Sequence, residues 1–331
     1  MKHMRKMFAS LFMVLLALSL VACQNNDTKE NEKSNEEQNE ENTEASNETE
    51  EDSFPITIKD ALENEVTIDE EPETIVSLIP SNTEIVYALG AGEKVIGVSD
   101  LDNYPEDVLN KEKIGSMDYN IEKIISLKPD VVLAHESIAN YAAEGFQQLQ
   151  DAGLTVIIIK NASSFEDVYS TIETIGKITG KYTASKEVVT NMKTKVAEIK
   201  EKSEVINEEE KLVVWTEISP APELYTTGKG TFMHEMLEMI GAHNAAGNQE
   251  GWPPYTEEDA VLLNPDVILV TYNFIDNPVD QVLTRDAWGN VPAVQNKRVY
   301  EVNDDLVSRP GPRLLEGVEE LATKIYPEIY K

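Results

Sequence analysis

The chain has 331 residues, 61 of them acidic and 28 basic, and its formal net charge is −33 at pH 7. A charge this negative argues against nucleic acid and anionic membrane surfaces as partners. A single cysteine excludes an internal disulfide, and it also excludes a cysteine-based metal cluster. The length suffices for two lobes of ordinary size after the terminal segments described next.

The chain begins with MKHMRKMFASLFMVLLALSLVACQ, which is typical of an export signal. Three basic residues precede an apolar run over residues 7–21 that is too short to span a membrane comfortably. The run ends in LVAC, which resembles the bacterial lipobox, where the cysteine receives lipid and the signal is removed. We therefore predict a lipoprotein signal over 1–22 with Cys23 as the lipidated residue. An ordinary signal with a chance cysteine is the alternative.

Residues 24–53 form a low-complexity segment with 12 acids, 2 lysines and no apolar side chain larger than alanine. Such a segment cannot bury a core, and we predict a disordered, solvated tether. Residues 23–53 would thus be the lipidated cysteine and its acidic linker. A binding segment for metal ions is the alternative for these acids.

The first folded region, residues 54–164, alternates predicted strands and helices. Two alternating runs around Glu63-Asn64 predict a β-hairpin. Ser81 or Asn82 is expected to cap a helix that ends near Gly90, and Asn120 to cap a short helix over 121–127. Further strands are expected at TIVSL, KVIGVSD, VVLA and LTVIIIK, and a further helix at YAAEGFQQLQDAG. This order predicts a mainly parallel α/β lobe.

Residues 165–206 have helical periodicity with a weak point near Gly180. We expect one long helix, or two helices in line, that connects the first lobe to the second.

The second region, residues 207–331, repeats the pattern of the first. The stretch IEKIISLKPDVVLAH at 121–135 recurs without gaps as EEDAVLLNPDVILVT at 257–271, with Thr256 as the expected cap. We infer two Rossmann-like α/β lobes joined by the connecting helix. Ligands of open α/β sheets bind outside the carboxyl ends of the strands, which predicts a ligand cleft between the lobes. His135 and Tyr272 follow matching strands and are expected to face it.

The ordered motifs now resemble a known family. ITIKDALENEVTI, IVSLIPSNTEIVYALGAG, IEKIISLKPDVVLA and EEDAVLLNPDVILV, behind a lipobox and an acidic tether, look like the solute-binding lipoproteins of ABC importers for cobalamin, ferric siderophores and haem. GWPPYTEEDAVL and NDDLVSRPGPR look most like the cobalamin binders. The resemblance covers residues 54–331. It implies a non-enzymatic protein held by lipid at the outer face of the cytoplasmic membrane, with cobalamin as bound ligand and no cofactor.

The resemblance also implies ligand-binding residues. Trp252 matches a tryptophan that stacks on the ligand of cobalamin binders, and a corrinoid ring with amide arms suits an aromatic face. Asp305 and Arg309 match polar contacts, and their alternative is a surface ion pair. Tyr225, Tyr119 and Met117 lie in loops after strands and are further candidates, whereas Arg313 is expected to be structural.

The repeated glutamates, Glu122 and Glu258, each follow a helix cap by two residues. A carboxylate there interacts favourably with the helix dipole, by ~0.3–1 kcal/mol. The resemblance implies a second role, docking onto arginines of the membrane permease dimer, whose ATPase subunits supply the energy. We expect the protein to act as a monomer.

Three other functions are open at this point. A ferric-siderophore or haem binder of the same fold would use cleft cations for an anionic ligand, or His135 or Tyr272 for haem iron. A bare metal-ion binder would need converging ligands, but only three histidines follow the signal. An enzyme is the third alternative, although the chain has no G-x-S-x-G, Walker A or G-x-G-x-x-G motif, and we predict no catalytic or metal-binding residues.

Overall fold

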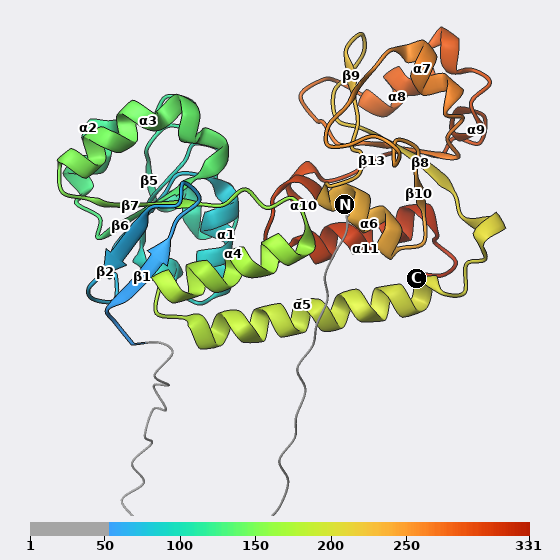
Figure 1. Ribbon diagram of the computed structural model, residues 1–331. Coiled ribbons are helices and arrows are strands. Elements are labelled where there is room, and N and C mark those ends of the chain that lie inside the picture. The colour runs from blue at the N-terminus through green and yellow to red at the C-terminus, as the bar shows by residue number, and fades with distance from the viewer. Residues whose placement is uncertain (1–52) are drawn as a thin grey trace, which may run out of the picture. The chain divides into compact units, whose positions relative to one another are not determined.

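The computed structural model describes residues 53–331, which lie in one compact unit (Figure 1). The predicted signal peptide 1–22, the lipidated Cys23 and the tether up to residue 52 lie outside the described residues. Within 53–331, no helix has both the length and the apolar character needed to cross a membrane.

The N-terminal part contains a β-hairpin and a parallel sheet. Strands β1 (Ile56–Lys59) and β2 (Glu65–Ile68) pair antiparallel, which confirms the predicted hairpin. The sheet has the order β5-β4-β3-β6-β7 and every pair in it is parallel. Its strands are β3 (Ile75–Ser77), β4 (Val95–Val98), β5 (Glu112–Lys113), β6 (Val131–His135) and β7 (Thr155–Ile159). Its helices are α1 (Pro80–Ala88), η2 (Gly92–Lys94), η3 (Glu106–Asn110), α2 (Ile121–Leu127) and α3 (Glu136–Asp151).

The C-terminal part contains a second parallel sheet, with the order β10-β8-β12-β13. Its strands are β8 (Val213–Glu217), β10 (His243–Asn244), β12 (Val267–Val270) and β13 (Val299–Glu301). A short antiparallel ribbon joins β9 (Leu224–Tyr225) and β11 (Pro254–Tyr255). The helices are η4 (Glu208–Glu210), α6 (Phe232–Met239), α7 (Glu257–Leu262), α8 (Pro278–Leu283), η5 (Asp286–Trp288), α9 (Pro292–Gln295), α10 (Asp304–Ser308) and α11 (Leu314–Ile325).

The connecting segment is a pair of helices, α4 (Phe165–Ile178) and α5 (Tyr182–Ser203), that pack side by side (Figure 1). The Lys193 ammonium lies 4.8 Å from the ring centre of Tyr169, so the chain reverses between the helices. Gly180 occupies the reversal with a φ of +70°, a conformation that glycine adopts without strain. The prediction of one helix, or two in line, over 165–206 is therefore wrong. Helix α5, with 22 residues, is the long helix that leads towards the second sheet.

One apolar core runs from the first sheet to the second through α4 and α5. It includes Ile172 of α4, Met192 of α5, Met236 of α6 and Leu321 of α11, all at most 2% exposed. Separate clusters cover the other face of each sheet. Both sheets are thus apolar on both faces, as parallel sheets require, and the shared core fastens the connecting helices to both lobes.

The repeated LKPD and LNPD motifs have the same structure in both halves. Lys128 and Asn264 end the short helices in the left-handed conformation, with φ of 51° and 50°. Asp130 then accepts a hydrogen bond of 2.8 Å from the backbone N–H of Thr74. Asp266 accepts one of 2.9 Å from the N–H of Val213. Each aspartate ties the start of its strand to the neighbouring strand, so the repeated motif is architectural and confirms the duplication.

The predicted helix caps are confirmed for two helices and wrong for a third. The side chain of Asn120 accepts from Lys123 N–H at the start of α2, and that of Thr256 accepts from Asp259 N–H at the start of α7. Helix α1 begins instead at Pro80, and Ser81 and Asn82 lie inside it. Proline at the first helical position has its φ already set and no N–H to satisfy, so it can begin a helix without a side-chain cap.

Candidate functional site

An aromatic pocket lies beyond the carboxyl ends of β8 and β12. Its volume is about 190 Å³, and it is lined by Ile218, Met233, Trp252, Thr271, Tyr272, Asn273, Phe274, Asp304, Val307 and Ser308. Trp252 is 50% exposed and Phe274 is 71% exposed, although both are large and apolar. Exposed aromatic side chains gathered at one site are characteristic of ligand-binding surfaces. The pocket therefore offers flat apolar surface to a ligand at the edge where α/β sheets bind.

Two aromatic pairs hold the pocket wall in place. The ring of Trp252 meets that of Phe232 edge-on, with 6.4 Å between centres. The ring of Phe274 lies 5.6 Å from that of Tyr272 in a tilted arrangement. Phe232 and Tyr272 are buried, so each exposed ring rests against a fixed one. This support lowers the entropy that the exposed rings would lose on binding a ligand.

The hydroxyl of Tyr272 points into a buried ion pair below the pocket. It donates a hydrogen bond of 2.6 Å to Oε1 of Glu217, which lies at the end of β8. Arg285 donates to both oxygens of Glu217, at 2.8 and 2.6 Å. Burial and the charge of Glu217 raise the pKa of Tyr272. Tyr272 thus contributes a ring edge to the pocket while its oxygen is occupied.

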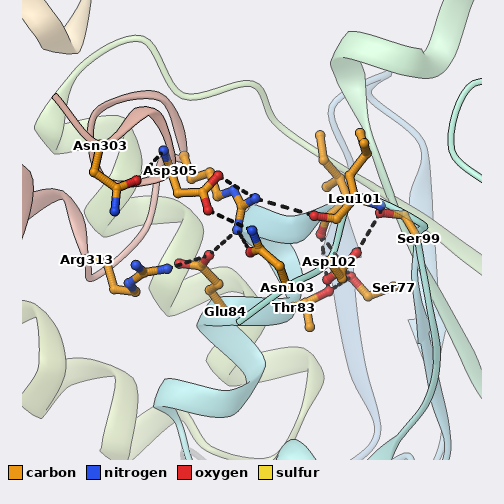
Figure 2. Close-up of polar contacts among 12 residues, drawn as sticks. Ser77, Thr83, Glu84, Ser99, Leu101, Asp102, Asn103, Asn303, Asp305 and Arg313 are labelled. Carbon is orange, nitrogen blue, oxygen red and sulfur yellow. Dashed lines mark hydrogen bonds and ion pairs between the residues drawn. The ribbon is translucent and has the colours of Figure 1, made fainter. Parts of the chain in front are cut away.

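Asp305 and Arg309, the predicted polar contacts, belong to a cluster that joins the two parts of the molecule. Figure 2 shows Asp305 of this cluster close to Asn103 and Glu84. Nη1 of Arg309 donates to Oε1 of Glu84 at 2.8 Å and to Oδ1 of Asn103 at 2.7 Å. Nη2 of Arg309 lies 2.6 Å from Oδ1 of Asp305. Asn103 donates in turn to Oδ2 of Asp305 at 2.8 Å. The pair is therefore not an isolated surface ion pair.

Arg313 completes this cluster from the other side of Glu84. Its Nη1 lies 3.0 Å from the same Oε1 that Arg309 contacts. Its guanidinium also stacks on Tyr104, with Cζ 3.8 Å from the ring centre. Glu84 is only 3% exposed, and burial, the largest influence, raises its pKa against the hydrogen bond from Arg309. The prediction that Arg313 is structural fits a guanidinium fixed on two sides.

His135 is a helix cap in this structure. It is the last residue of β6 and is 3% exposed, and its Nδ1 accepts a hydrogen bond of 3.2 Å from Ser137 N–H at the start of α3. Burial lowers its pKa to about 4. The imidazole is therefore neutral at pH 7 and is occupied at one nitrogen.

The structure does not bring the other three ligand candidates into the aromatic pocket. Tyr119 donates its hydroxyl to the carbonyl of Leu78 at 2.9 Å, and burial raises its pKa. Met117 is 75% exposed and is not among the residues that line the pocket. Tyr225 lines a different groove, which it shares with Glu258.

The repeated glutamates occupy equivalent exposed positions. Glu122 is the second residue of α2, and Glu258 is the second residue of α7. Neither carboxylate forms an ion pair or a side-chain hydrogen bond with another residue of 53–331. Two free negative charges at matched positions are suited to contact with a partner.

Some residues of the site were not identified from the sequence, among them Glu84 and Glu217. One signal was available for Glu84. Arg309 and Arg313 lie close together on either side of a Pro-Gly-Pro segment, and two neighbouring guanidinium groups need a carboxylate partner when they are partly buried. In the described part of the chain, no cluster of three or more histidine, cysteine or acidic side chains is arranged to hold a metal ion.

The fold agrees with the comparison to known proteins. The periplasmic binding protein family matches residues 75–306. The chain belongs to the periplasmic binding protein family. It is a substrate-binding protein of an ABC transporter, a non-enzymatic component of transport.

Individual relatives agree over most of the chain. An uncharacterized ABC transporter substrate-binding lipoprotein of Bacillus subtilis, YvrC, is 51% identical over 278 residues, which is 84% of this chain and 88% of that protein. A cobalamin-binding protein of Halobacterium salinarum is 28% identical over 283 residues, 83% of this chain and 75% of that protein. The crystal structure of a possible iron-binding, periplasmic solute-binding protein of Staphylococcus epidermidis has 38% identity and a TM-score of 0.70 and covers 78% of this chain and all of that one.

Proposed function

We propose that the protein captures a corrinoid such as cobalamin outside the cell membrane and delivers it to an ABC importer. The observation that carries this proposal is the exposed aromatic wall of Trp252 and Phe274 beside guanidinium groups whose charges are already compensated. A corrinoid is a broad, largely apolar ring with amide arms, and it needs stacking surfaces and hydrogen bonds more than counter-charges. The cobalamin-binding relative of Halobacterium salinarum supports the same ligand class.

The charges near the pocket favour a ligand close to neutral. Arg309 and Arg313 share Glu84, and Arg309 also contacts Asp305. Arg285 is held by Glu217. A strongly anionic catecholate complex would have to displace one of these carboxylates, which would leave a buried charge without a partner.

Cys23 anchors the protein in this proposal. The signal over 1–22 directs export, lipid on Cys23 holds the chain at the outer face of the cytoplasmic membrane, and the acidic segment 24–53 spaces the folded part from the bilayer. Stable attachment needs two or more acyl chains, because one chain binds only marginally. The printed name of YvrC as a lipoprotein supports this arrangement.

The partner is a permease dimer with its ATPase subunits, and the protein meets it as a monomer. Glu122 and Glu258 are the docking residues, one on each lobe. Exposed charges of this kind give orientation and faster encounter more than affinity. Their places at the amino ends of α2 and α7 leave both carboxylates at an exposed helix end.

A ferric siderophore or haem is the second candidate ligand. The similarity to the possible iron-binding protein of Staphylococcus epidermidis, at 38% identity, supports this second candidate. Haem is the weaker of the two, because His135 is buried as a helix cap and the oxygen of Tyr272 is bonded to Glu217.

Isothermal titration of the full chain, purified in detergent, tests the proposal. The ligands are cyanocobalamin, a ferric hydroxamate, a ferric catecholate and haemin. We expect saturable heat with cyanocobalamin. Heat with an iron complex and none with cyanocobalamin would replace the corrinoid by the second candidate. Turnover of a ligand would contradict the assignment as a binding protein.

A further inference from the structure

Among residues 53–331, Glu84 is the one carboxylate that contacts both arginines of the cluster next to the pocket. Its Oε1 lies 2.8 Å from Nη1 of Arg309 and 3.0 Å from Nη1 of Arg313. We propose that Glu84 is a specificity-determining residue that, together with Asp305, cancels the charge of these arginines and so makes the site reject anionic ligands. The inference rests on the proposed function, because it names the charge class of ligand that the same site admits.

Helix α10 lies between this cluster and the aromatic pocket. Its residues Asp304, Val307 and Ser308 line the aromatic pocket. Asp305 of the same helix, and Arg309 directly after it, belong to the cluster instead. Positions four apart on a helix share a face, so α10 presents one face to the pocket and another to the cluster. A ligand on the aromatic wall is therefore separated from the guanidinium groups by a single helix.

Burial strengthens the electrostatic interactions of Glu84. The side chains of Arg309 and Arg313 are 13% and 15% exposed, and that of Glu84 is 2% exposed. Charges this far from water interact strongly and are screened little by salt. An incoming anion would have to replace Glu84 as the partner of the arginines, at the cost of leaving the glutamate buried and unpaired. The negative charges of Glu84 and Asp305 also repel an anion, so the site gains specificity by disfavouring anionic ligands.

Neither arginine can turn away to meet an anion elsewhere. Arg313 is clamped between Glu84 and the ring of Tyr104. Arg309 is held by Asn103 and Asp305 in addition to Glu84. If Glu84 loses its charge, Asp305 still contacts Arg309, but Arg313 loses the carboxylate that it contacts. The site then has an unmatched positive charge that an anionic ligand can satisfy.

The test measures affinity for ligand pairs that differ in charge. One pair is cyanocobalamin and its derivative with one amide arm hydrolysed to a carboxylate. The other is a neutral ferric trihydroxamate and a trianionic ferric catecholate. Full-length protein in detergent carries Glu84→Gln, which keeps the shape and removes the charge. Glu93→Gln is the matched control, because Glu93 is an exposed acid in η2, at the amino end of β4, and does not belong to the cluster.

We expect Glu84→Gln to raise the affinity for the anionic member of a bound pair, relative to the neutral member, by about tenfold, equivalent to ~1.4 kcal/mol. Glu93→Gln should leave this affinity ratio unchanged. No shift in a folded Glu84→Gln protein would overturn the inference. If that variant does not fold, Asp305→Asn must raise the same affinity ratio by a smaller factor. An unchanged ratio in Asp305→Asn would then overturn the inference.

Failure of the proposed function gives a different pattern. Wild-type protein would then bind neither corrinoid. The effect of Glu84→Gln on the ratio of affinities for the ferric catecholate and the ferric trihydroxamate would still be measurable. A wild-type protein that binds cyanocobalamin, with no shift in either variant, would keep the proposed function and reject the role of Glu84.

Discussion

Arg285 donates hydrogen bonds of 2.8 and 2.6 Å to the two carboxylate oxygens of Glu217, below Tyr272. Glu217 is fully buried, and the arginine side chain is 10% exposed. Removing one partner of a buried ion pair leaves the other without compensation. We expect Arg285→Met to lower the free energy of unfolding by about 3–5 kcal/mol. Urea denaturation of wild type and variant measures the difference.

The double variant Glu217→Gln with Arg285→Met provides the control for that prediction. It removes both charges, so it should be more stable than Arg285→Met alone. A double variant that is less stable than Arg285→Met would show that the loss comes from packing around Arg285 and not from an unpaired charge.

The buried helix cap His135 predicts a pH dependence of stability. Its pKa is lowered from 6.5 to about 4 in the folded protein. Between those values the unfolded chain takes up a proton and the folded protein does not. The contribution of neutral His135 to the free energy of unfolding is therefore fully present above pH 6.5. It is lost as the pH falls towards 4, by about 3 kcal/mol for this one group.

The difference between wild type and His135→Asn isolates this contribution. Asparagine can still cap α3 but does not titrate. Urea denaturation at pH 7 and pH 4.5 should show a steeper loss for wild type than for His135→Asn. His243→Asn, which changes an exposed histidine, should keep the steep loss. Equal losses in wild type and His135→Asn would contradict the assignment of His135 as a buried neutral cap.

The duplicated fold was predictable because its signals are local. The short helices of both halves have a capping side chain, a left-handed residue and then Pro-Asp, and every part of that motif lies within a dozen residues. The connecting helices were not predictable in the same way. Helical periodicity continues on both sides of Gly180, and glycine permits either a continuous helix or a reversal. The packing of Tyr169 against Lys193, which decides for the reversal, is a tertiary contact.

The site was only partly predictable for a related reason. Trp252, in a loop with glycine and prolines, was expected at the pocket, and the structure places it there. The partners of the polar candidates could not be read from the sequence. Glu84 and Arg309 are separated by 225 positions, and no periodic pattern relates them. Tyr272 follows its strand as expected, but whether its hydroxyl faces solvent or Glu217 depends on the folded core.

The matched positions of Glu122 and Glu258 predict a separation of transport from binding. The double variant Glu122→Ala with Glu258→Ala should bind ligand as tightly as wild type, because neither residue lines the aromatic pocket. Uptake of labelled cyanocobalamin by cells should be abolished, since docking loses a charge on each lobe. Persistent uptake in the double variant would contradict the docking role.

Removing two negative charges elsewhere tests whether position or net charge matters. Glu187 of α5 and Glu316 of α11 are exposed and lie on other elements. The double variant Glu187→Ala with Glu316→Ala should keep both binding and uptake. Equal loss of uptake in both double variants would assign the effect to overall charge.

Trp252 supports the last prediction, a loss of binding with little loss of stability. Its side chain is 50% exposed and rests edge-on against Phe232, so truncation removes ligand-facing surface more than core. We expect Trp252→Ala to weaken cyanocobalamin binding by roughly thirtyfold, about 2 kcal/mol, as for an aromatic residue at the centre of an interface. The free energy of unfolding should change by no more than about 1 kcal/mol. Leu262→Ala, at an apolar residue that is 80% exposed and outside the pocket, is the control and should change neither quantity. Unchanged affinity in Trp252→Ala would move the ligand away from the aromatic wall.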